Sequence, residues 1–224
     1  MGERMALAVQ IGDHGKRLLV VSRFAVMPTP LIHCTGKLAK LLGVKARTAI
    51  ADADGWNANL FPIAGRKCII ATHKATFFSL IKFDVVKADL KDFPGFFHAL
   101  LREQLLLQWP MHASAIDAWL NTLRPAALTT SDNDKRTLGV MNRFVDEFTF
   151  NRDWFQTPLL EPHLRVANWN LNNNVVGGGK DRHALKNPER EMAGAIGIPY
   201  DREDADLRYR EAKQALERGH LRVT

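Results

Sequence analysis

The sequence predicts an α+β fold: an antiparallel sheet, built as a hairpin and meander, packed against several helices, with an irregular and helical C-terminal extension. Two apolar runs, 56–63 and 67–72, flank a turn that contains Gly65, which is the pattern of a β-hairpin. A third run, 76–81, follows after a short connection and favours an antiparallel meander. From residue 93 onward, apolar residues recur at helical spacing.

The chain of 224 residues is long enough for one large domain with additions at its ends. We expect residues 1–30 to form an N-terminal extension or edge hairpin, with apolar strands on either side of a turn at 12–15. Residues 31–150 are expected to form the core α+β domain. Residues 151–224 are expected to form an Asn/Gly-rich loop and a charged helical tail.

The core is predicted to begin with a short buried strand, 31–34, followed by a helix that Thr35 caps and Gly43 ends. Pro62 lies inside the first hairpin strand, and a proline there favours an edge position or a bulge. Prolines and capping residues delimit the later core elements. These are a helix over 93–109, a second helix that Ser114 caps and Pro125 ends, a return strand over 126–130, and a helix that opens at Asp132 or Asn133 and runs through Phe148.

The tail contains an Asn-rich stretch over 168–174 that runs into the glycines 177–179, a composition that predicts a flexible linker or an ordered functional loop. Lys180 follows, but the leading strand and the Walker spacing of a phosphate-binding loop are missing. Two helices are predicted beyond it, over 188–196 and 203–219. The second is highly charged with a thin apolar stripe, which is typical of a surface helix or of one that docks on a partner.

The composition supports a packed core, since nearly half of the residues are hydrophobic and a quarter are charged. No apolar run approaches the roughly 20 residues that span a bilayer, so we expect a cytoplasmic chain without membrane contact. Cys34 and Cys68 lie in apolar surroundings without a near Cys partner, which predicts buried thiols rather than a disulfide or a zinc site. No cofactor and no metal are expected.

The net charge is +7, and the whole excess lies in the first hundred residues. Residues 1–100 carry 14 Lys or Arg against 7 Asp or Glu, whereas residues 101–224 carry 17 of each sign. A basic segment serves phosphate-bearing partners through counterion release, and it equally serves to keep a protein soluble. Both interpretations stay open.

The familiar catalytic motifs are missing from the sequence: there is no Walker A loop, no G-x-S-x-G elbow and no H-E-x-x-H. The catalytic candidates are His33, in the first core strand, and His73, at the end of the second hairpin strand. A histidine with a carboxylate acts as a general base, and one at a strand end is well placed to face a cleft. A structural role for both histidines is the alternative.

Two polar groups are candidate binding sites. The segment 129–136 joins a predicted strand to a helix, where backbone N–H groups and Arg136 suit an anion; the alternative is a capping sequence. In the first hairpin strand, Asn57 and Asn59 share a face opposite to Trp56, so the two amides suit a base or peptide edge, or bonds to neighbouring loops. The candidate binding residues are Trp56, Asn57, Asn59, Arg66, Thr130, Arg136 and Asn142.

Five segments occur in an informative order within the core. They are 31–38 (LIHCTGKL), 56–60 (WNANL), 66–72 (RKCIIAT), 76–79 (TFFS) and 136–142 (RTLGVMN). Together they resemble a family of small bacterial proteins that is catalogued as a domain of unknown function. The resemblance covers about residues 31–150, and it implies the extent of the core without implying a mechanism.

These observations favour a binding or accessory module that contacts nucleic acid or a protein partner, in a bacterial defence or toxin–antitoxin setting suggested by the type of family. One alternative is a phosphate-directed hydrolase such as a ribonuclease, which requires His33, His73, Arg66 and Arg136 to converge in one cleft. Another is a structural subunit whose tail docks on another chain. Any site is expected where the hairpin strands meet the turn at 129–136.

Overall fold

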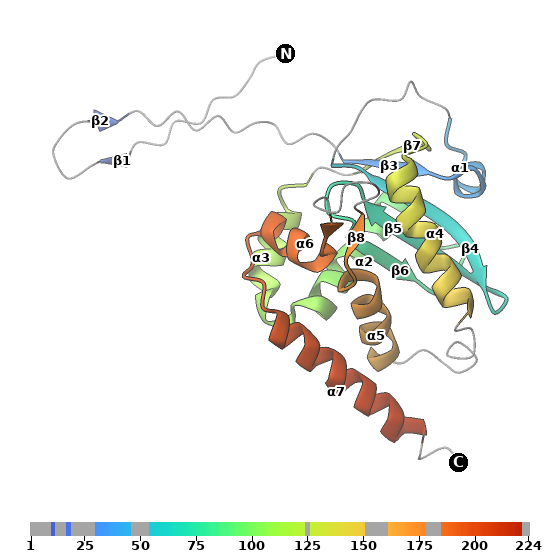
Figure 1. The fold of residues 1–224 in the computed structure, drawn as a ribbon. Helices are drawn as coiled ribbons and strands as arrows, with labels where there is room; N and C mark the ends of the chain where they lie inside the picture. The colour runs from blue at the N-terminus through green and yellow to red at the C-terminus, as the bar shows by residue number, and fades with distance from the viewer. Residues whose placement is uncertain are drawn as a thin grey trace.

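The computed structural model describes residues 10–11, 17–18, 30–45, 54–123, 126–150, 161–177 and 185–220. Its centre is a five-stranded sheet in the order β6-β5-β4-β3-β7 (Figure 1). The strands are β3 (Leu31–Cys34), β4 (Trp56–Ile63), β5 (Arg66–His73), β6 (Ser79–Lys82) and β7 (Ala127–Thr130). With helices on both faces of this sheet, the predicted α+β class is confirmed.

The hairpin and the third strand form the antiparallel meander that the sequence predicts, with β5 between β4 and β6. Ala64 and Gly65 join β4 to β5 with φ of 47° and 80°, as a two-residue type I′ turn requires. The sheet as a whole is nevertheless mixed, because β3 pairs in parallel with both β4 and β7. Parallel neighbours need a crossover connection, and α1 (Gly36–Leu42) lies in the crossover between β3 and β4.

Pro62 lies in β4, which is an interior strand of the sheet. On the β3 side, however, β4 is paired only from Trp56 to Ala58, because β3 is much shorter than β4. The Pro62 end of β4 is therefore a local edge, and Pro62 is exposed there. A proline is tolerated at such an edge because its missing N–H breaks no ladder bond.

Four helices cover one face of the sheet. They are α1, α2 (Phe93–Gln108), α3 (Ala113–Leu120) and α6 (Pro188–Ile196), and a 3₁₀ turn at Pro110–His112 joins α2 to α3. Their apolar residues form one core cluster with Trp56, Ile69 and Leu80 of the sheet. We call this side of the sheet the α2 face.

The opposite side carries α4 (Lys135–Phe150), which crosses the sheet in Figure 1, and α5 (Glu161–Asn172). Phe61 and Ile70 of the sheet pack here with Phe144 of α4 in a second core cluster. Ile69 and Ile70 thus point to different faces, as consecutive residues of a strand do. We call this side the α4 face.

The Asn-rich stretch, for which the sequence suggests a loop, belongs to α5 as far as Asn172. Asparagine is a poor helix former, but Asn168 and Asn172 are four residues apart and hydrogen-bond to each other across one helical turn. Beyond it, α7 (Arg202–His220) packs against α5, away from the sheet (Figure 1). Residues after 150 therefore contribute helices to both faces.

Two small antiparallel pairs complete the described part of the chain. β1 (Gln10–Ile11) pairs with β2 (Arg17–Leu18), as a hairpin in the N-terminal extension would, and β8 (Val176–Gly177) pairs with β9 (Leu185–Lys186). The predicted turn at 12–15 and the segment 178–180 lie outside the described residues. Among the helices that are described, none has the length and apolar character needed to cross a membrane.

Candidate functional site

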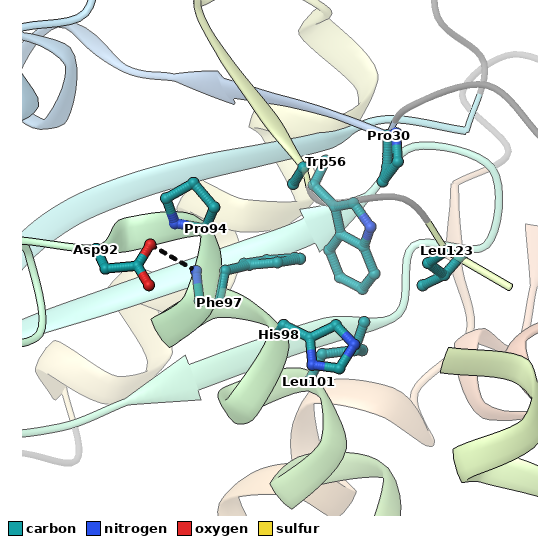
Figure 2. Close-up of a pocket in the computed structure, with 10 residues that line it drawn as sticks. Pro30, Trp56, Asp92, Pro94, Phe97, His98, Leu101 and Leu123 are labelled. Atoms are coloured by element: carbon teal, nitrogen blue, oxygen red, sulfur yellow. Dashed lines mark hydrogen bonds between the residues drawn. The ribbon is translucent and has the colours of Figure 1, made fainter. Parts of the chain in front are cut away.

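A pocket of about 390 Å³ opens on the α2 face, at the edge of the sheet where β3, β4 and β7 begin (Figure 2). Its lining is mainly apolar and comes from Pro30, Trp56, Pro94, Gly95, Phe97, Leu101, Leu123 and Ala126, with Asp92 and His98 as its polar members. We call it the Trp56 pocket. Its size lies at the lower end of the roughly 300–1,000 Å³ that small-molecule sites occupy.

Trp56, the first residue of β4, supplies an aromatic wall of this pocket and is only 3% exposed. Its ring meets Phe97 of α2 edge-on, with 5.2 Å between the ring centroids, and contacts the His73 ring at 4.9 Å. Figure 2 shows the rings of Trp56, Phe97 and His98 around the pocket. The wall is therefore rigid, because two elements of the core hold it in place.

The start of α2 forms the polar rim of the Trp56 pocket. The Asp92 carboxylate accepts a hydrogen bond from the Gly95 N–H at 3.1 Å and caps the helix. A Cβ atom at Gly95 would lie 2.2 Å from the Asp92 carboxylate, so a larger residue here would displace the capping side chain. His98 lies on the same helix and is exposed to solvent.

A row of polar side chains crosses all five strands on the α4 face. The register aligns Thr129 of β7, His33 of β3, Asn57 of β4, Thr72 of β5 and Ser79 of β6. All five residues are between 0% and 5% exposed. We call these five residues the polar row. Buried polar groups need hydrogen-bond partners, so the partners of each member decide what the row does.

The half of the polar row near β6 is fully bonded. The hydroxyls of Thr72 and Ser79 lie 2.8 Å apart, and Ser79 also donates to the Phe77 carbonyl at 3.1 Å. Asn172 of α5 accepts from the Ser79 N–H at 2.7 Å and donates to the Ser79 carbonyl at 3.0 Å. These hydrogen bonds hold α5 against the edge strand β6.

The half near β3 is different. Within the part of the chain that the structure describes, both ring nitrogens of His33 and both amide atoms of Asn57 are buried without a hydrogen-bond partner. The Asp132 carboxylate lies beside His33, with its Oδ2 3.7 Å from His33 Nε2. Lys74 Nζ donates to the same carboxylate at 2.6 Å. This contact ties the β5–β6 turn to the loop between β7 and α4.

Asp132 is held in its charged form. Burial by itself would raise the pKa of this carboxyl, but the hydrogen bonds from Lys74 and from the Asp134 N–H, with the positive charges nearby, lower the pKa below its ordinary value. The Lys74–Asp132 pair is largely buried, with exposed fractions of 12% and 14%. Asp132 of this pair is the group that approaches His33.

The N-terminus of α4, predicted as an anion site, is already occupied by side chains of the chain itself. Asp134 accepts from the Arg136 N–H at 3.1 Å, and Asp132 accepts from the Asp134 N–H at 3.2 Å. Arg136 lies over the Phe77 ring at 5.4 Å, not beside an open anion site. The capping alternative therefore describes this segment.

The four groups of the hydrolase hypothesis do not converge. His33 and His73 lie on opposite faces of the sheet, because His33 is aligned with Asn57 and His73 with Trp56. His73 is bonded to Thr76. Arg66 lies at the hairpin turn, where it pairs with Asp84 at 3.4 Å.

The remaining binding candidates are dispersed. Asn59 shares the face of Asn57, as predicted, but its Oδ1 accepts from Thr35 Oγ1 at 2.7 Å, which ties β4 to the start of α1. Thr130 is half-buried at the end of β7, aligned with Cys34, and Asn142 is exposed on α4. Of the seven candidates, only Trp56 lines the pocket and only Asn57 belongs to the polar row.

Several residues of these two sites escape sequence reasoning. Lys74 and Asp132 come together across 58 positions of the chain, and a helical pattern over 93–109 does not show that Phe97 and His98 line a pocket. One usable signal was a polar residue inside each apolar strand, namely Thr129, His33, Asn57, Thr72 and Ser79. Among the described residues, the structure also brings no three His, Cys, Asp or Glu side chains together as metal ligands.

The fold and the two sites define an α+β protein whose mixed sheet carries an apolar pocket at one edge and a buried polar row on the other face. The chain belongs to the family described as a domain of unknown function (DUF6933), whose model matches residues 31–191. The predicted resemblance is confirmed, and the match extends beyond residue 150 through α5 into α6. A search of curated proteins finds no match.

Proposed function

We propose that the chain is a binding module that holds an apolar side chain of a protein partner in the Trp56 pocket. The observation that carries this proposal is the pocket itself, with its rigid aromatic wall and two polar groups at its rim. Energetic anchors of protein interfaces are single aromatic or aliphatic side chains that fill such pockets. The pocket volume of about 390 Å³ is sufficient for one such side chain.

A protein partner fits the geometry better than nucleic acid does. Reading a base edge would require the amides of Asn57 and Asn59 at the surface, but Asn57 is buried and Asn59 bonds to Thr35. Phosphate contact by Arg136 would compete with its position over the Phe77 ring. Nucleic-acid binding, the other part of the sequence-based hypothesis, becomes an outcome of the test below.

The other sequence-based hypotheses have less support. The ribonuclease version needs four groups in one cleft, and His33 and His73 lie on opposite faces. A structural subunit would be the obligate form of the same binding module, with α7 as a second contact. An accessory role in a bacterial defence or toxin–antitoxin system is part of the proposal, and identifying the partner would test it.

The test blocks the pocket from its exposed rim. His98→Trp places a large ring at the mouth of the pocket, and Glu103→Trp, also exposed on α2 but outside the pocket lining, is the matched control. A partner is isolated by co-purification from the native host, and its affinity for each variant is measured by calorimetry. We expect His98→Trp to weaken binding by about tenfold or more, and Glu103→Trp to leave it unchanged.

Indole provides a test that does not depend on the partner. We expect indole to shift the methyl resonances of Leu101 and Leu123 in the wild type but not in His98→Trp. Equal partner affinity of the two tryptophan variants would contradict the proposal. So would a salt-dependent complex with RNA or DNA that persists unchanged in His98→Trp and competes with the protein partner.

A further inference from the structure

We propose that His33 and Asn57 form the floor of a second ligand site, which accepts a small, neutral, planar molecule whose edge carries a hydrogen-bond donor beside an acceptor, as a carboxamide or a nucleobase does. The site lies on the α4 face, opposite the Trp56 pocket. The inference is therefore independent of the proposed function, and each can fail without the other.

The contrast within the polar row carries the inference. Thr72 and Ser79 are as deeply buried as His33 and Asn57, but each of their hydroxyls has a hydrogen-bond partner. His33 and Asn57 present four polar atoms without a hydrogen-bond partner among the described residues, on adjacent strands and on the same face. The fold satisfies the polar atoms of Thr72 and Ser79 with its own groups. The unbonded polar atoms of His33 and Asn57 are therefore available to a ligand.

The charges around His33 exclude an anion as the ligand. Lys74 and the N-terminus of α4, the positive groups next to Asp132, are already bonded to Asp132 and Asp134, and Arg136 and Lys186 on the same face lie over the Phe77 ring. An added anion would lie beside the Asp132 carboxylate, which is 3.7 Å from His33. A like charge at this distance in a buried site is unfavourable.

A metal ion is disfavoured by the same geometry. The carboxylate that would bind it together with His33 holds the Lys74 ammonium at 2.6 Å, so a divalent cation would have to displace a positive charge or lie next to it. A neutral ligand disturbs neither the ion pair nor the capped helix. Its interaction with the floor then consists of hydrogen bonds alone.

The chemistry of the floor defines the edge of the ligand. The Asn57 carboxamide offers one acceptor and a neighbouring donor, which match a complementary donor and acceptor two bonds apart in an amide or a base. The His33 imidazole, when neutral, adds one donor and one acceptor. Asp132, which lies beside His33 and is partly exposed together with Lys74, marks the side from which we expect the ligand to enter.

Matched probe pairs test this edge on the full-length protein. Nicotinamide and adenine carry the required edge, whereas nicotinate replaces the amide by a carboxylate and purine lacks the exocyclic amine. Adenine and purine are both used as their N9-methyl derivatives, because a free N9–H beside N3 would give purine a donor–acceptor edge of its own. Binding is followed through the His33 side-chain resonances. We expect Kd values of about 1 mM or tighter for nicotinamide or adenine, and binding at least about tenfold weaker for the matched partner. The arm that binds more tightly distinguishes an amide from a nucleobase ligand.

Two variants connect the binding to the floor. Asn57→Leu removes the edge while conserving shape, and Asn57→Asp, which keeps the acceptor and loses the donor, is the second variant if the first does not fold. Thr72→Val is the control, because it alters the same row in its bonded half. We expect both Asn57 variants to lose the preference between matched probes and Thr72→Val to retain it.

Three results would overturn the proposal. One is that no probe shifts the His33 resonances. Another is that Asn57→Leu binds nicotinamide or adenine as the wild type does. The third is a crystal structure, soaked with the probes, in which ordered water alone bonds to His33 and Asn57, because buried water satisfies such groups in many proteins.

Discussion

At the scale of single residues, the polar row joins two kinds of buried side chain. Removing one partner of a bonded pair costs free energy, whereas replacing an unbonded polar group by an apolar one of the same shape can be neutral or stabilising. We therefore expect Thr72→Val to lower the free energy of unfolding by about 0.5–1.5 kcal/mol, and Asn57→Leu to leave it unchanged or raise it. Urea unfolding of the two variants, adjacent in the row, measures the difference.

A clear loss of stability in Asn57→Leu would contradict this expectation, because it would show that Asn57 has protein partners. A gain would identify Asn57 as a residue that the chain retains at the expense of stability. Functional sites are where such residues are found. The stability measurement therefore supports or weakens the second ligand site without any ligand being present.

The two cysteines allow a second prediction at this scale. Cys34 and Cys68 are free and fully buried, as the sequence predicts. Burial raises the pKa of Cys34 to about 12 and that of Cys68 to about 11. Because the thiolate is the reactive form, we expect no reaction of the native protein with Ellman's reagent at pH 8. Both thiols should react after unfolding in guanidinium; rapid labelling of the folded chain would show that one face opens readily.

The contribution of Asp132 to the stability of the fold depends on pH. Its pKa in the folded chain lies below the ordinary value of 3.8, so its stabilising contribution is complete above pH 3.8 and is lost as the pH falls through the lower, folded value. We expect Asp132→Asn to cost about 1.5–3 kcal/mol at pH 7, because Lys74 loses a charged partner. The difference from the wild type should shrink below pH 3.8.

Urea unfolding at pH 7 and pH 3 measures this change. Asp146→Asn, on the exposed side of α4, is the control and should behave like the wild type at both values. A constant difference between Asp132→Asn and the wild type across this range would mean that the carboxylate acts through its shape and not through its charge.

At the scale of elements, the sequence predicts pairing between neighbouring strands better than pairing between strands that are far apart in the chain. The β4–β5–β6 meander could be predicted because its apolar runs and its turn at Gly65 are contiguous in sequence. The parallel pairing of β3 with β4 and β7 could not, since it depends on how two long crossovers pack. The shared face of Asn57 and Asn59 follows from strand geometry alone. Strand geometry alone does not, however, predict which residues lie next to Asn57 across the sheet.

The last part of α5 illustrates why propensity misleads at this scale. An Asn-rich run predicts a loop because asparagine favours turns. Here Asn172 instead bonds the backbone of Ser79 and the side chain of Asn168, so tertiary contacts outweigh the local preference. No sequence pattern announces such a contact across 93 positions. The Lys74–Asp132 pair of the second site could not be predicted for the same reason, because its two residues are also far apart in the chain.

The junction of α6 and α7 allows a prediction about one ion pair. Glu189 is completely buried in the first turn of α6, and Arg208 of α7 donates to it at 3.1 Å. Burial raises the pKa of Glu189, and hydrogen bonding from Gln108 together with the charge of Arg208 offsets this only in part. We expect Arg208→Met to cost about 3–5 kcal/mol, because it removes the cation that is bonded to a buried carboxylate. Glu189→Gln should cost less, and a double-mutant cycle measures the coupling.

The raised pKa also determines how this junction responds to pH. A carboxyl whose pKa is higher in the folded chain destabilises it as the pH rises from the ordinary value of 4.5 through the raised value. We therefore expect the penalty of Arg208→Met to be smaller at pH 4.5 than at pH 7, and Glu189→Gln to remove this dependence. Equal penalties at both pH values would show that Arg208 contributes packing and not charge.

At the scale of the whole molecule, the two core clusters and α7 are separable. The clusters on the α2 and α4 faces include residues from the sheet and from α1 to α6, but none of the described residues of α7. The family match ends at residue 191, inside α6. Tyr209 of α7 stacks on Trp169 of α5 with 4.1 Å between the ring centroids, so α7 is attached to a helix and not to the sheet.

We therefore expect a chain without residues 202–224 to keep its sheet and to unfold cooperatively at a lower temperature. The loss of Arg208 leaves Glu189 without its cation, which corresponds to about 3–5 kcal/mol and a melting temperature lower by roughly 6–20 °C. Circular dichroism and calorimetry measure both properties. Glu189→Gln in the shortened chain should recover part of the loss, since it removes the buried charge. A shortened chain without a cooperative transition would instead make α7 part of the folding unit, despite its absence from both clusters.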